Sequence, residues 1–413
     1  MVRGGARGRP AAQARFVRQR AKIGGTVVTQ AHRVVRDHLL SASLAVTLAV
    51  GCSEGTGPHP ALVWISVSAS ADHTCGVTTS GAAYCWGHNG YGAFGNGVSS
   101  DNSAVPVAVS GGLTFRFLRA GYGYTPYGTG YTCGLTSTGR AYCWGANDYG
   151  RLGDGSFTGH LTPVPVTGGL TYAGLTAFAF HTCAVTTSGG AYCWGENSAI
   201  DTSGAASITT PVAVTGGLTF ASVTVGANHT CGLTTDGIAY CWGLDLGDSS
   251  TTYRLVPTAV VGGLRFTSLT AGYAHTCGVT PSGAAYCWGD NGSGQLGDGT
   301  TASRSMPVAV AGGLTFASLS SGYFHTCGLT GRGAAYCWGS NSWGQFGDGD
   351  TTTSLTPVAV AAGLTFASVS AGGAHTCGVT PGGAAYCWGA NNLGTLGDGT
   401  TIQRLRPARV TNP

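Results

Sequence analysis

HTCGVTPSGAAYCWG, residues 275–289, decides the fold of this chain, because close copies of it occur seven times. The copies begin at His73, Tyr131, His181, His229, His275, His325 and His375. Each copy has a glycine at the end of its short turn, which is Gly283 in the copy that begins at His275. A three-residue hairpin loop needs one residue at positive φ, which glycine adopts without steric cost. The stretch therefore predicts two antiparallel strands joined by a tight turn.

The two cysteines of each copy are expected to form a disulfide. Folding the hairpin about Ser282 places Cys277 opposite Cys287, and facing Cβ atoms lie about 4.5–5.5 Å apart, close enough for a bridge. The alternative is a zinc site, but this spacing is not that of a tight zinc knuckle, and no second ligand pair recurs with it. The expected pairs are Cys75 with Cys85, Cys133 with Cys143, Cys183 with Cys193, Cys231 with Cys241, Cys277 with Cys287, Cys327 with Cys337 and Cys377 with Cys387.

The two faces of the hairpin are expected to differ. Side chains alternate between the faces of a sheet, so Val279 and Ala285 lie with the cysteines, and Tyr286 and Trp288 lie on the other face. Tyr286 would then cover Gly278, an aromatic ring over a position without a side chain. The tryptophan occurs once per copy and is expected to serve packing.

Composition narrows the class of protein. The chain has 413 residues, of which 72 are glycine and only 9% are charged, as suits many short strands joined by tight turns. Seven regularly spaced cysteine pairs indicate an oxidising compartment. The net charge of +4 is uneven: residues 1–51 hold nine Lys or Arg, whereas the rest holds 11 Arg and 15 Asp or Glu, a difference of about −4. A lysine-free, mildly acidic body argues against nucleic-acid binding.

Residues 1–51 are expected to be a basic leader and signal peptide. Arg33 and Arg36 precede the apolar run of residues 39–51, as in a secretory signal. This run is too short to cross a bilayer comfortably.

Residues 49–52, Ala-Val-Gly-Cys, resemble the lipobox of bacterial lipoproteins, although Ala49 stands where leucine is usual. The resemblance implies that Cys52 receives a lipid and becomes the mature N-terminus. Residues 52–60 would then comprise the lipidated cysteine and a short linker. The alternative is a plain secretory signal that leaves Cys52 free.

The repeat array predicts the fold class. First cysteines recur at intervals of 58, 50, 48, 46, 50 and 50 residues, and a period near 50 is typical of propellers and solenoids. Four strands per unit and seven units predict an all-β seven-bladed β-propeller of four-stranded antiparallel blades over residues 61–413. The array starts and ends at a strand, at 64–68 and 406–410, as expected if the ends meet. In the sixth unit the expected strands are Phe316–Ser320, Thr326–Thr330, Ala334–Trp338 and Pro357–Val360.

The repeat also resembles a known family. Gly-x-x-His-Thr-Cys-Gly-Leu/Val-Thr, followed by Ala-Tyr-Cys-Trp-Gly-x-Asn-x-x-Gly-Gln-Leu-Gly-Asp-Gly, is similar to the regulator-of-chromosome-condensation repeat over about residues 61–413. The resemblance implies a seven-bladed propeller, and the cysteine pairs look like those of an exported bacterial branch. Members of the family include an exchange factor for a nuclear GTPase, chromatin binders, a light sensor and a bacterial inhibitor of β-lactamases. Their activities reside in loops outside the repeat motif, so no functional residue is carried over.

The recurring histidines and aspartates could bind metal ions, but we expect each to have a structural role instead. One histidine per blade would hold the imidazoles too far apart to share an ion, so we expect hydrogen bonds to backbone between blades. The Gly-Asp-Gly segments at Asp154, Asp298, Asp348 and Asp398 suggest calcium, but Asp-Gly is also an ordinary turn dipeptide. We therefore expect turns, no metal and no other cofactor.

The second unit contains the candidate binding residues. Between Gly121 and Cys133 it is seven residues longer than its counterparts, with the sequence GYGYTPYGTGYTC. Rigid aromatic side chains are favoured in binding patches, and arginines nearby offer polar anchors. The alternative is a tolerated insertion whose rings pack on the next blade. The candidates are Tyr122, Tyr124, Tyr127 and Arg119.

The sequence indicates a binding protein and no enzyme, because it has no nucleophile elbow, zinc-protease motif or phosphate-cradling loop. We expect an exported, lipid-anchored, monomeric module of the cell envelope that binds a protein or glycan through its loops. Its only link to a membrane would be the lipid. The alternatives are a secreted soluble form, an inhibitor of an extracellular hydrolase, and an intracellular guanine-nucleotide exchange or chromatin-binding factor.

Overall fold

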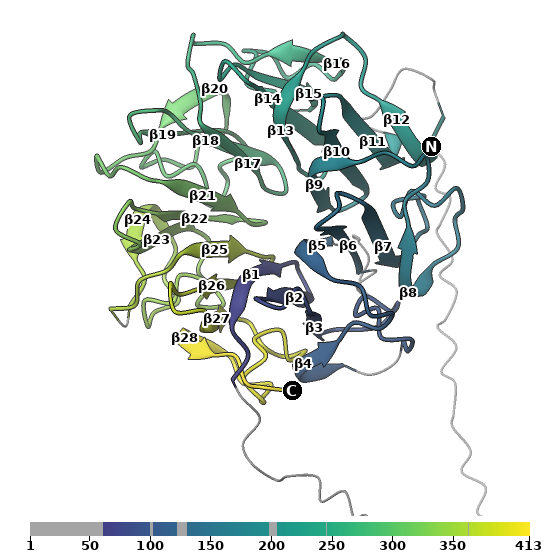
Figure 1. The fold of residues 1–413 in the computed structure, drawn as a ribbon. Coiled ribbons are helices and arrows are strands. Elements are labelled where there is room, and N and C mark those ends of the chain that lie inside the picture. The colour runs from purple at the N-terminus through teal and green to yellow at the C-terminus, as the bar shows by residue number, and fades with distance from the viewer. Residues whose placement is uncertain (1–60, 100–101, 122–129, 198–204, 245, 362) are drawn as a thin grey trace, which may run out of the picture. The chain divides into compact units, whose positions relative to one another are not determined.

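The computed structural model describes residues 61–99, 102–121, 130–197, 205–244, 246–361 and 363–413. The chain divides into two units, Met1–Gly57 and Pro58–Pro413, and the described residues belong to the second. These residues form seven four-stranded antiparallel sheets arranged as the blades of a ring (Figure 1). The prediction of an all-β seven-bladed propeller is confirmed. The leader, the signal peptide and Cys52 lie outside the described residues.

Each blade is a meander in which strands follow one another in chain order. Blades one and two are β1 (Trp64–Ala69), β2 (His73–Thr78), β3 (Ala83–Gly87), β4 (Ser103–Ala108), and β5 (Phe115–Gly121), β6 (Tyr131–Thr136), β7 (Ala141–Gly145), β8 (His160–Pro165). Blades three and four are β9 (Tyr172–Phe178), β10 (His181–Thr186), β11 (Ala191–Glu196), β12 (Ser207–Ala213), and β13 (Phe220–Val225), β14 (His229–Thr234), β15 (Ala239–Gly243), β16 (Arg254–Ala259).

The other three blades have the same order with a shorter first strand. Blade five is β17 (Ser268–Ala271), β18 (His275–Val279), β19 (Ala285–Gly289) and β20 (Arg304–Ala309). Blade six is β21 (Ser318–Ser321), β22 (His325–Leu329), β23 (Ala335–Gly339) and β24 (Ser354–Ala359). Blade seven is β25 (Ser368–Ala371), β26 (His375–Val379), β27 (Ala385–Gly389) and β28 (Arg404–Arg409).

The four strands expected in the sixth unit occur with shifted ends. β21 begins at Ser318, two residues after the expected start, because Phe316 leaves the strand and buries its ring. β24 begins at Ser354, ahead of the expected Pro357, and pairs Ser354 with Gly339 beyond a bulge. Proline is tolerated in β24 because this is the edge strand of the blade, where its missing N–H breaks no ladder.

The hairpin register is the one that the sequence predicts. Cys277 pairs with Cys287 and Gly278 with Tyr286, and the corresponding pairs face each other in all seven copies. Each facing cysteine pair is a disulfide, with Cα atoms 4.0–4.1 Å apart. The structure therefore has bridges where the sequence left a zinc site as the alternative.

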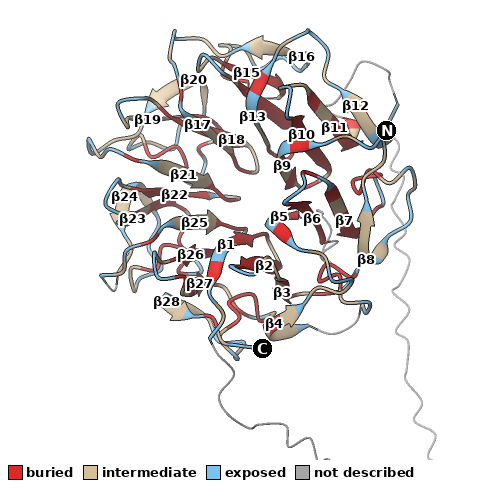
Figure 2. Ribbon diagram, viewed as in Figure 1, coloured by how far each residue is buried: buried red, intermediate tan, exposed pale blue. Residues whose placement is uncertain are grey.

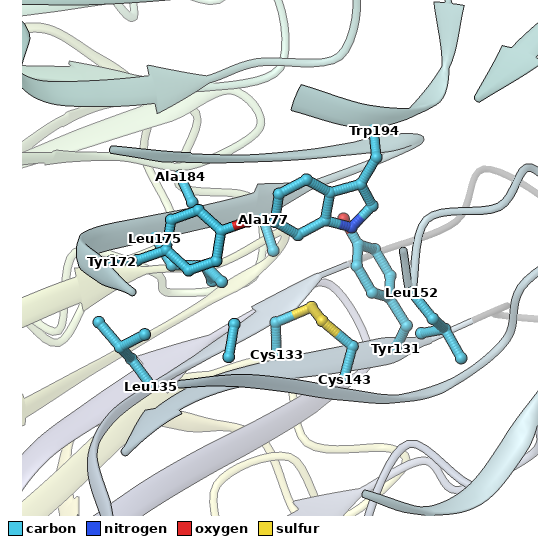
Figure 3. Packing of buried hydrophobic residues seen from close by; sticks show 11 residues of the cluster. Tyr131, Cys133, Leu135, Cys143, Leu152, Tyr172, Leu175, Ala177, Ala184 and Trp194 are labelled. Carbon is cyan, nitrogen blue, oxygen red and sulfur yellow. A yellow bond between two sulfur atoms is a disulfide. The ribbon is translucent and has the colours of Figure 1, made fainter. Parts of the chain in front are cut away.

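The two faces of each hairpin pack against different neighbours. The cysteines of blade five lie in one cluster with Val279, Ala285 and Trp338 of the next blade. Trp288 lies in the cluster of the preceding blade's cysteines. In six of the seven blades the disulfide thus shares a buried cluster with the tryptophan of the following blade, as Figure 3 shows for Trp194 over the second bridge. The seven tryptophans are fully buried between the blades, which confirms that they serve packing.

The aromatic cover of Gly278 was predicted wrongly. A Cβ atom at Gly278 would lie 2.5 Å from Cδ1 of Phe266, and the tyrosine is not among the nearest atoms. Phe266 precedes β17, is buried and packs on Trp288 at 5.9 Å between ring centroids. Glycine is needed at position 278 because the ring of Phe266, just before the first strand of the blade, occupies the space above it.

The ring closes through the same contacts that join the other blades. Trp64 and Trp86 of the first blade share a buried cluster with Cys377 and Cys387 of the last. The backbone N–H of Gly373 donates to the carbonyl of Ser70 at 2.9 Å. Every blade is continuous in sequence, so no sheet among the described residues combines strands of the first and last units.

Burial follows the position of each strand. The second and third strands are buried, whereas the fourth strand is mostly half-buried or exposed (Figure 2). Within the described parts of the chain, no helix is long and apolar enough to cross a membrane.

Candidate functional site

The two faces of the ring carry different connections. Because neighbouring strands are antiparallel, the turn after a blade's first strand and the loop after its third strand lie at the same end of the sheet. We call this end of all seven blades the loop face; its opposite end carries the tight hairpin turns. The described residues of the loop face are 70–72, 88–99, 102, 130, 146–159, 179–180, 197, 205–206, 226–228, 244, 246–253, 272–274, 290–303, 322–324, 340–353, 372–374 and 390–403.

Exposed aromatic side chains gather on the loop face. Among the described residues, all six aromatic side chains that are exposed belong to its segments. Trp343 is the largest, with 51% of its surface accessible. The exposed half of this ring contributes no burial to the fold, whereas aromatic side chains are enriched in the centres of protein interfaces. The six are Tyr91, Tyr149, Phe157, Tyr253, Phe324 and Trp343.

Three further rings bridge the centre of the ring at this face. Phe178, at the end of β9 in blade three, lies 5.6 Å from Tyr323 of blade six, measured between centroids. Tyr323 in turn lies 5.1 Å from Tyr273 of blade five. Blades three and six are not neighbours, so the contact between Phe178 and Tyr323 spans the central channel. We call Phe178, Tyr273 and Tyr323 the aromatic bridge.

Blade two departs from the repeat in two buried positions. Tyr131 takes the place of the histidine found in the other blades, and its hydroxyl donates to the carbonyl of His181 at 2.9 Å. Burial raises the pKa of Tyr131 to about 12. The guanidinium of Arg151 lies 5.3 Å from the ring centre of Tyr131 and 5.4 Å from that of Tyr149. Tyr131 and Arg151 are the two departures from the repeat, and they are in direct contact.

Sequence reasoning missed Arg151. Its side chain is fully buried and donates to the carbonyl of Ala179 at 3.2 Å and to the carboxylate of Asp148 at 3.2 Å. Gln295 and Gln345 occupy the corresponding place in two other blades. An arginine where two other units have glutamine was the signal available in the sequence.

The candidate residues from the sequence fall in different places. Tyr122, Tyr124 and Tyr127 lie outside the described residues. Arg119 lies in β5 and reaches into the central channel rather than onto the loop face. The structure therefore does not bring Arg119 to the exposed aromatic side chains.

The recurring histidines join neighbouring blades, but the acceptor is a side chain and not the expected backbone. His325 Nε2 lies 3.0 Å from Thr376 Oγ1 of the next blade, and this hydroxyl donates to the carbonyl of Gln345 at 2.8 Å. The hydroxyl proton is therefore used, so the imidazole Nε2–H donates to the threonine. Burial lowers the pKa of the six histidines to about 3 or 4; they are His73, His181, His229, His275, His325 and His375.

The aspartates of the Gly-Asp-Gly segments serve turns. Asp298 accepts hydrogen bonds from the backbone N–H and hydroxyl of Thr300, at 2.9 and 2.7 Å, and from Arg304 at 2.8 Å. Burial raises the pKa of this carboxyl, but the hydrogen bonds outweigh burial and lower it. Both carboxylate oxygens are thus engaged by the chain itself. The part of the chain that the structure describes contains no group of three or more His, Cys, Asp or Glu that could hold a metal ion.

Comparison with known proteins places the chain in a family. Residues 127–413 match the model of the RCC1-like domain, and residues 64–93 match that of the regulator of chromosome condensation (RCC1) repeat. The chain is 31% identical over 99 residues to the human E3 ubiquitin-protein ligase HERC2, a stretch that is 24% of this chain and 2% of that protein.

Two solved structures show the same fold. Prp20p from Saccharomyces cerevisiae matches with a TM-score of 0.71 at 21% identity, over 85% of this chain and 88% of that one. The ectodomain of the Physcomitrella patens receptor kinase CR4 matches with a TM-score of 0.53 at 24% identity, over 79% of this chain and 74% of that one.

Proposed function

The chain belongs to the family of RCC1-like domain proteins, and on this premise we propose that it is an exported, lipid-anchored module that binds a protein partner on its loop face. RCC1-like propellers are generally binding or exchange-factor modules and not catalysts. Prp20p binds Gsp1p and histones, and these partners are proteins. The family therefore favours a protein over a glycan as the partner.

The gathering of exposed aromatic side chains supports the loop face as the binding surface. Trp343 and Phe324 are both exposed there and belong to one blade. Large exposed apolar side chains mark interaction sites when they collect on one surface.

The seven disulfides support export, because structural bridges persist in oxidising compartments and are rare in the cytosol. The CR4 match is an ectodomain, so this fold occurs in a protein domain outside the cell membrane. An exchange factor or chromatin-binding protein would need an intracellular location, which the bridges disfavour. A secreted hydrolase is one class of protein that an exported module meets, and inhibition of such an enzyme would be one form of this function.

Site-specific photocrosslinking in the native cells tests the binding face. A photoreactive phenylalanine analogue is placed at Trp343, at Phe324 or at Met306, which lies in β20 and is 53% exposed but off the loop face. The first two positions should give the same crosslinked protein, and Met306 should not. A crosslinking pattern that is identical at all three positions contradicts the proposal, and a product lost on deglycosylation shows a glycan partner instead.

Substitution tests the energetics of the same surface. Trp343→Ala and Phe324→Ala should each weaken binding of the crosslinked partner by at least tenfold, as for aromatic residues at interface centres. Met306→Ala is the matched control and should leave affinity unchanged. If the partner is a hydrolase, its activity is measured with and without the propeller.

Labelling with a clickable fatty acid tests the anchor. The chain should carry the label, and Cys52→Ser should abolish it. Secretion of an unlabelled chain contradicts the anchor while leaving export intact, and a chain that keeps residues 1–51 in the cytosol contradicts export.

A further inference from the structure

A ring of hydroxyl groups surrounds the central channel. In the first strand of every blade, the residue that pairs with the first cysteine lines this channel, whose volume is about 720 Å³. In six blades that residue is a serine or threonine, and in blade two it is Arg119. The six hydroxyl residues are Ser68, Thr176, Thr224, Thr270, Ser320 and Ser370.

Five of these hydroxyl groups, those of Ser68, Thr224, Thr270, Ser320 and Ser370, accept hydrogen bonds from the next blade. The backbone N–H of Ala371 donates to Ser320 Oγ at 2.9 Å, and that of Ala69 donates to Ser370 Oγ at 3.0 Å. A hydroxyl that accepts in this way still has its own proton to donate. A guanidinium has no acceptor atom, so Arg119 cannot make the blade-to-blade bond. Its presence in the ring is therefore not explained by the repeat.

Among the residues that the structure describes, the charge of Arg119 has no partner of opposite sign. Its contacts there are a hydrogen bond from Nη1 to the carbonyl of Leu118 at 3.2 Å and the ring of Phe117, 4.8 Å away. No aspartate or glutamate is among the described residues that line the channel. The guanidinium meets solvent inside the channel, but protein surrounds it, and this desolvation lowers the pKa of Arg119.

A second polar group in the channel wall also lacks a partner within the described part of the chain. Ser321 Oγ, from blade six, is buried and makes no hydrogen bond to any described residue. Ala271 and Ala371 occupy the matching position in the neighbouring blades, so this hydroxyl is again specific to one blade. A buried hydroxyl costs free energy unless a ligand or water satisfies it.

We propose that the central channel binds one small tetrahedral oxyanion, of the phosphate or sulfate class. Arg119 neutralises its charge, and hydroxyl groups of the ring together with Ser321 donate to its oxygens. Charge-assisted hydrogen bonds of arginine to such oxygens are among the stronger ones in proteins. The aromatic bridge lies over the channel at the loop face, so the anion enters from the opposite end. A free anion thus fits better than an acidic segment of a partner held on the loop face.

Calorimetric titration of the mature chain with sodium phosphate, at ionic strength balanced with sodium chloride, tests this site. The chain and Arg116→Gln should each bind one phosphate. Arg116 is the matched control, because it lies in the same strand, contacts Phe117 and does not line the channel. Arg119→Thr, which restores the hydroxyl of the other blades, should weaken binding at least tenfold, and Ser321→Ala should weaken it severalfold.

Three results would contradict an oxyanion site in the channel. Equal phosphate binding by the chain and by Arg119→Thr overturns the assignment, as does the absence of binding of both phosphate and sulfate to the chain. Binding of acetate but of neither phosphate nor sulfate overturns the tetrahedral class and indicates a carboxylate. Thermal unfolding of Arg119→Thr in phosphate-free buffer establishes that the variant is folded. None of these outcomes depends on the partner proposed for the loop face.

Discussion

His375 Nε2 lies 2.8 Å from Thr74 Oγ1, so the last blade is bonded to the first by the same two residue types that join other neighbouring blades. The hydroxyl of Thr74 donates in turn to the carbonyl of Thr395 at 2.9 Å. The first and last blades therefore meet in an interface of the ordinary kind. Closure needs no strand exchanged between the ends.

Removing this hydroxyl should cost as much as removing one between interior blades. Thr74→Val and Thr326→Val should each lower the free energy of unfolding by about 1–3 kcal/mol, because each leaves a buried imidazole N–H without an acceptor. Denaturant titration measures the loss, with the exposed Thr79→Val as control. A neutral Thr74→Val beside a destabilising Thr326→Val would indicate that the ring is open.

Stability should fall with acid well before the carboxylates titrate. The six buried histidines have pKa values of about 3 or 4 in the fold and 6.5 when unfolded, so the unfolded chain binds more protons below pH 6.5. Their contribution to the stability of the fold is complete above pH 6.5 and is lost as the pH falls toward 4. Each histidine makes the free energy of unfolding fall by up to about 1.4 kcal/mol for each pH unit of acidification. Urea titrations at pH 7.5, 6.5, 5.5 and 4.5 measure this slope, and a flat profile contradicts the burial of neutral imidazoles.

The glycine opposite the hairpin tyrosine should not tolerate a methyl group. Gly278→Ala places a Cβ atom 2.5 Å from the ring of Phe266 and should lower the free energy of unfolding by about 1–3 kcal/mol. Gly292→Ala is the control, because its Cβ would lie no closer than 3.6 Å to any atom beyond its two chain neighbours. Thermal unfolding measures the melting temperatures of both variants. Equal melting temperatures would show that the ring of Phe266 moves freely.

The Gly-Asp-Gly turns should be indifferent to calcium. Asp298→Ala removes the acceptor of Thr300 and Arg304 and should cost about 1–3 kcal/mol of stability. Asp350→Ala should cost less than Asp298→Ala, because the hydrogen bonds of Asp350 to Thr351 and Thr352 are exposed to solvent. Melting temperatures in millimolar calcium and in chelator should be equal for the unsubstituted chain, and a calcium-dependent rise would identify a metal site.

The sequence predicted what local periodicity determines. The register of Cys277 with Cys287 follows from alternation and a short turn, both of which are visible in one repeat. The cover over Gly278 was predicted wrongly, because Phe266 reaches it from a segment twelve residues earlier whose path only the fold defines. A correct pairing of strands therefore did not identify the neighbours above them.

The candidate site was predictable only in part. The loop between β5 and β6 stood out by its length, but the channel position of Arg119 depends on which strand is innermost, and the repeat pattern does not say. The aromatic bridge was also beyond prediction, because Phe178 and Tyr323 belong to blades that are distant in sequence and meet only across the closed ring.

Thiol alkylation of the chain, purified without reductant from the cells that make it, tests the central claim most directly. The account predicts that none of the fourteen paired cysteines reacts until the protein is unfolded and reduced, whereupon all fourteen do. Fourteen reactive thiols in the unfolded but unreduced chain would contradict the bridged blades and the export that they imply.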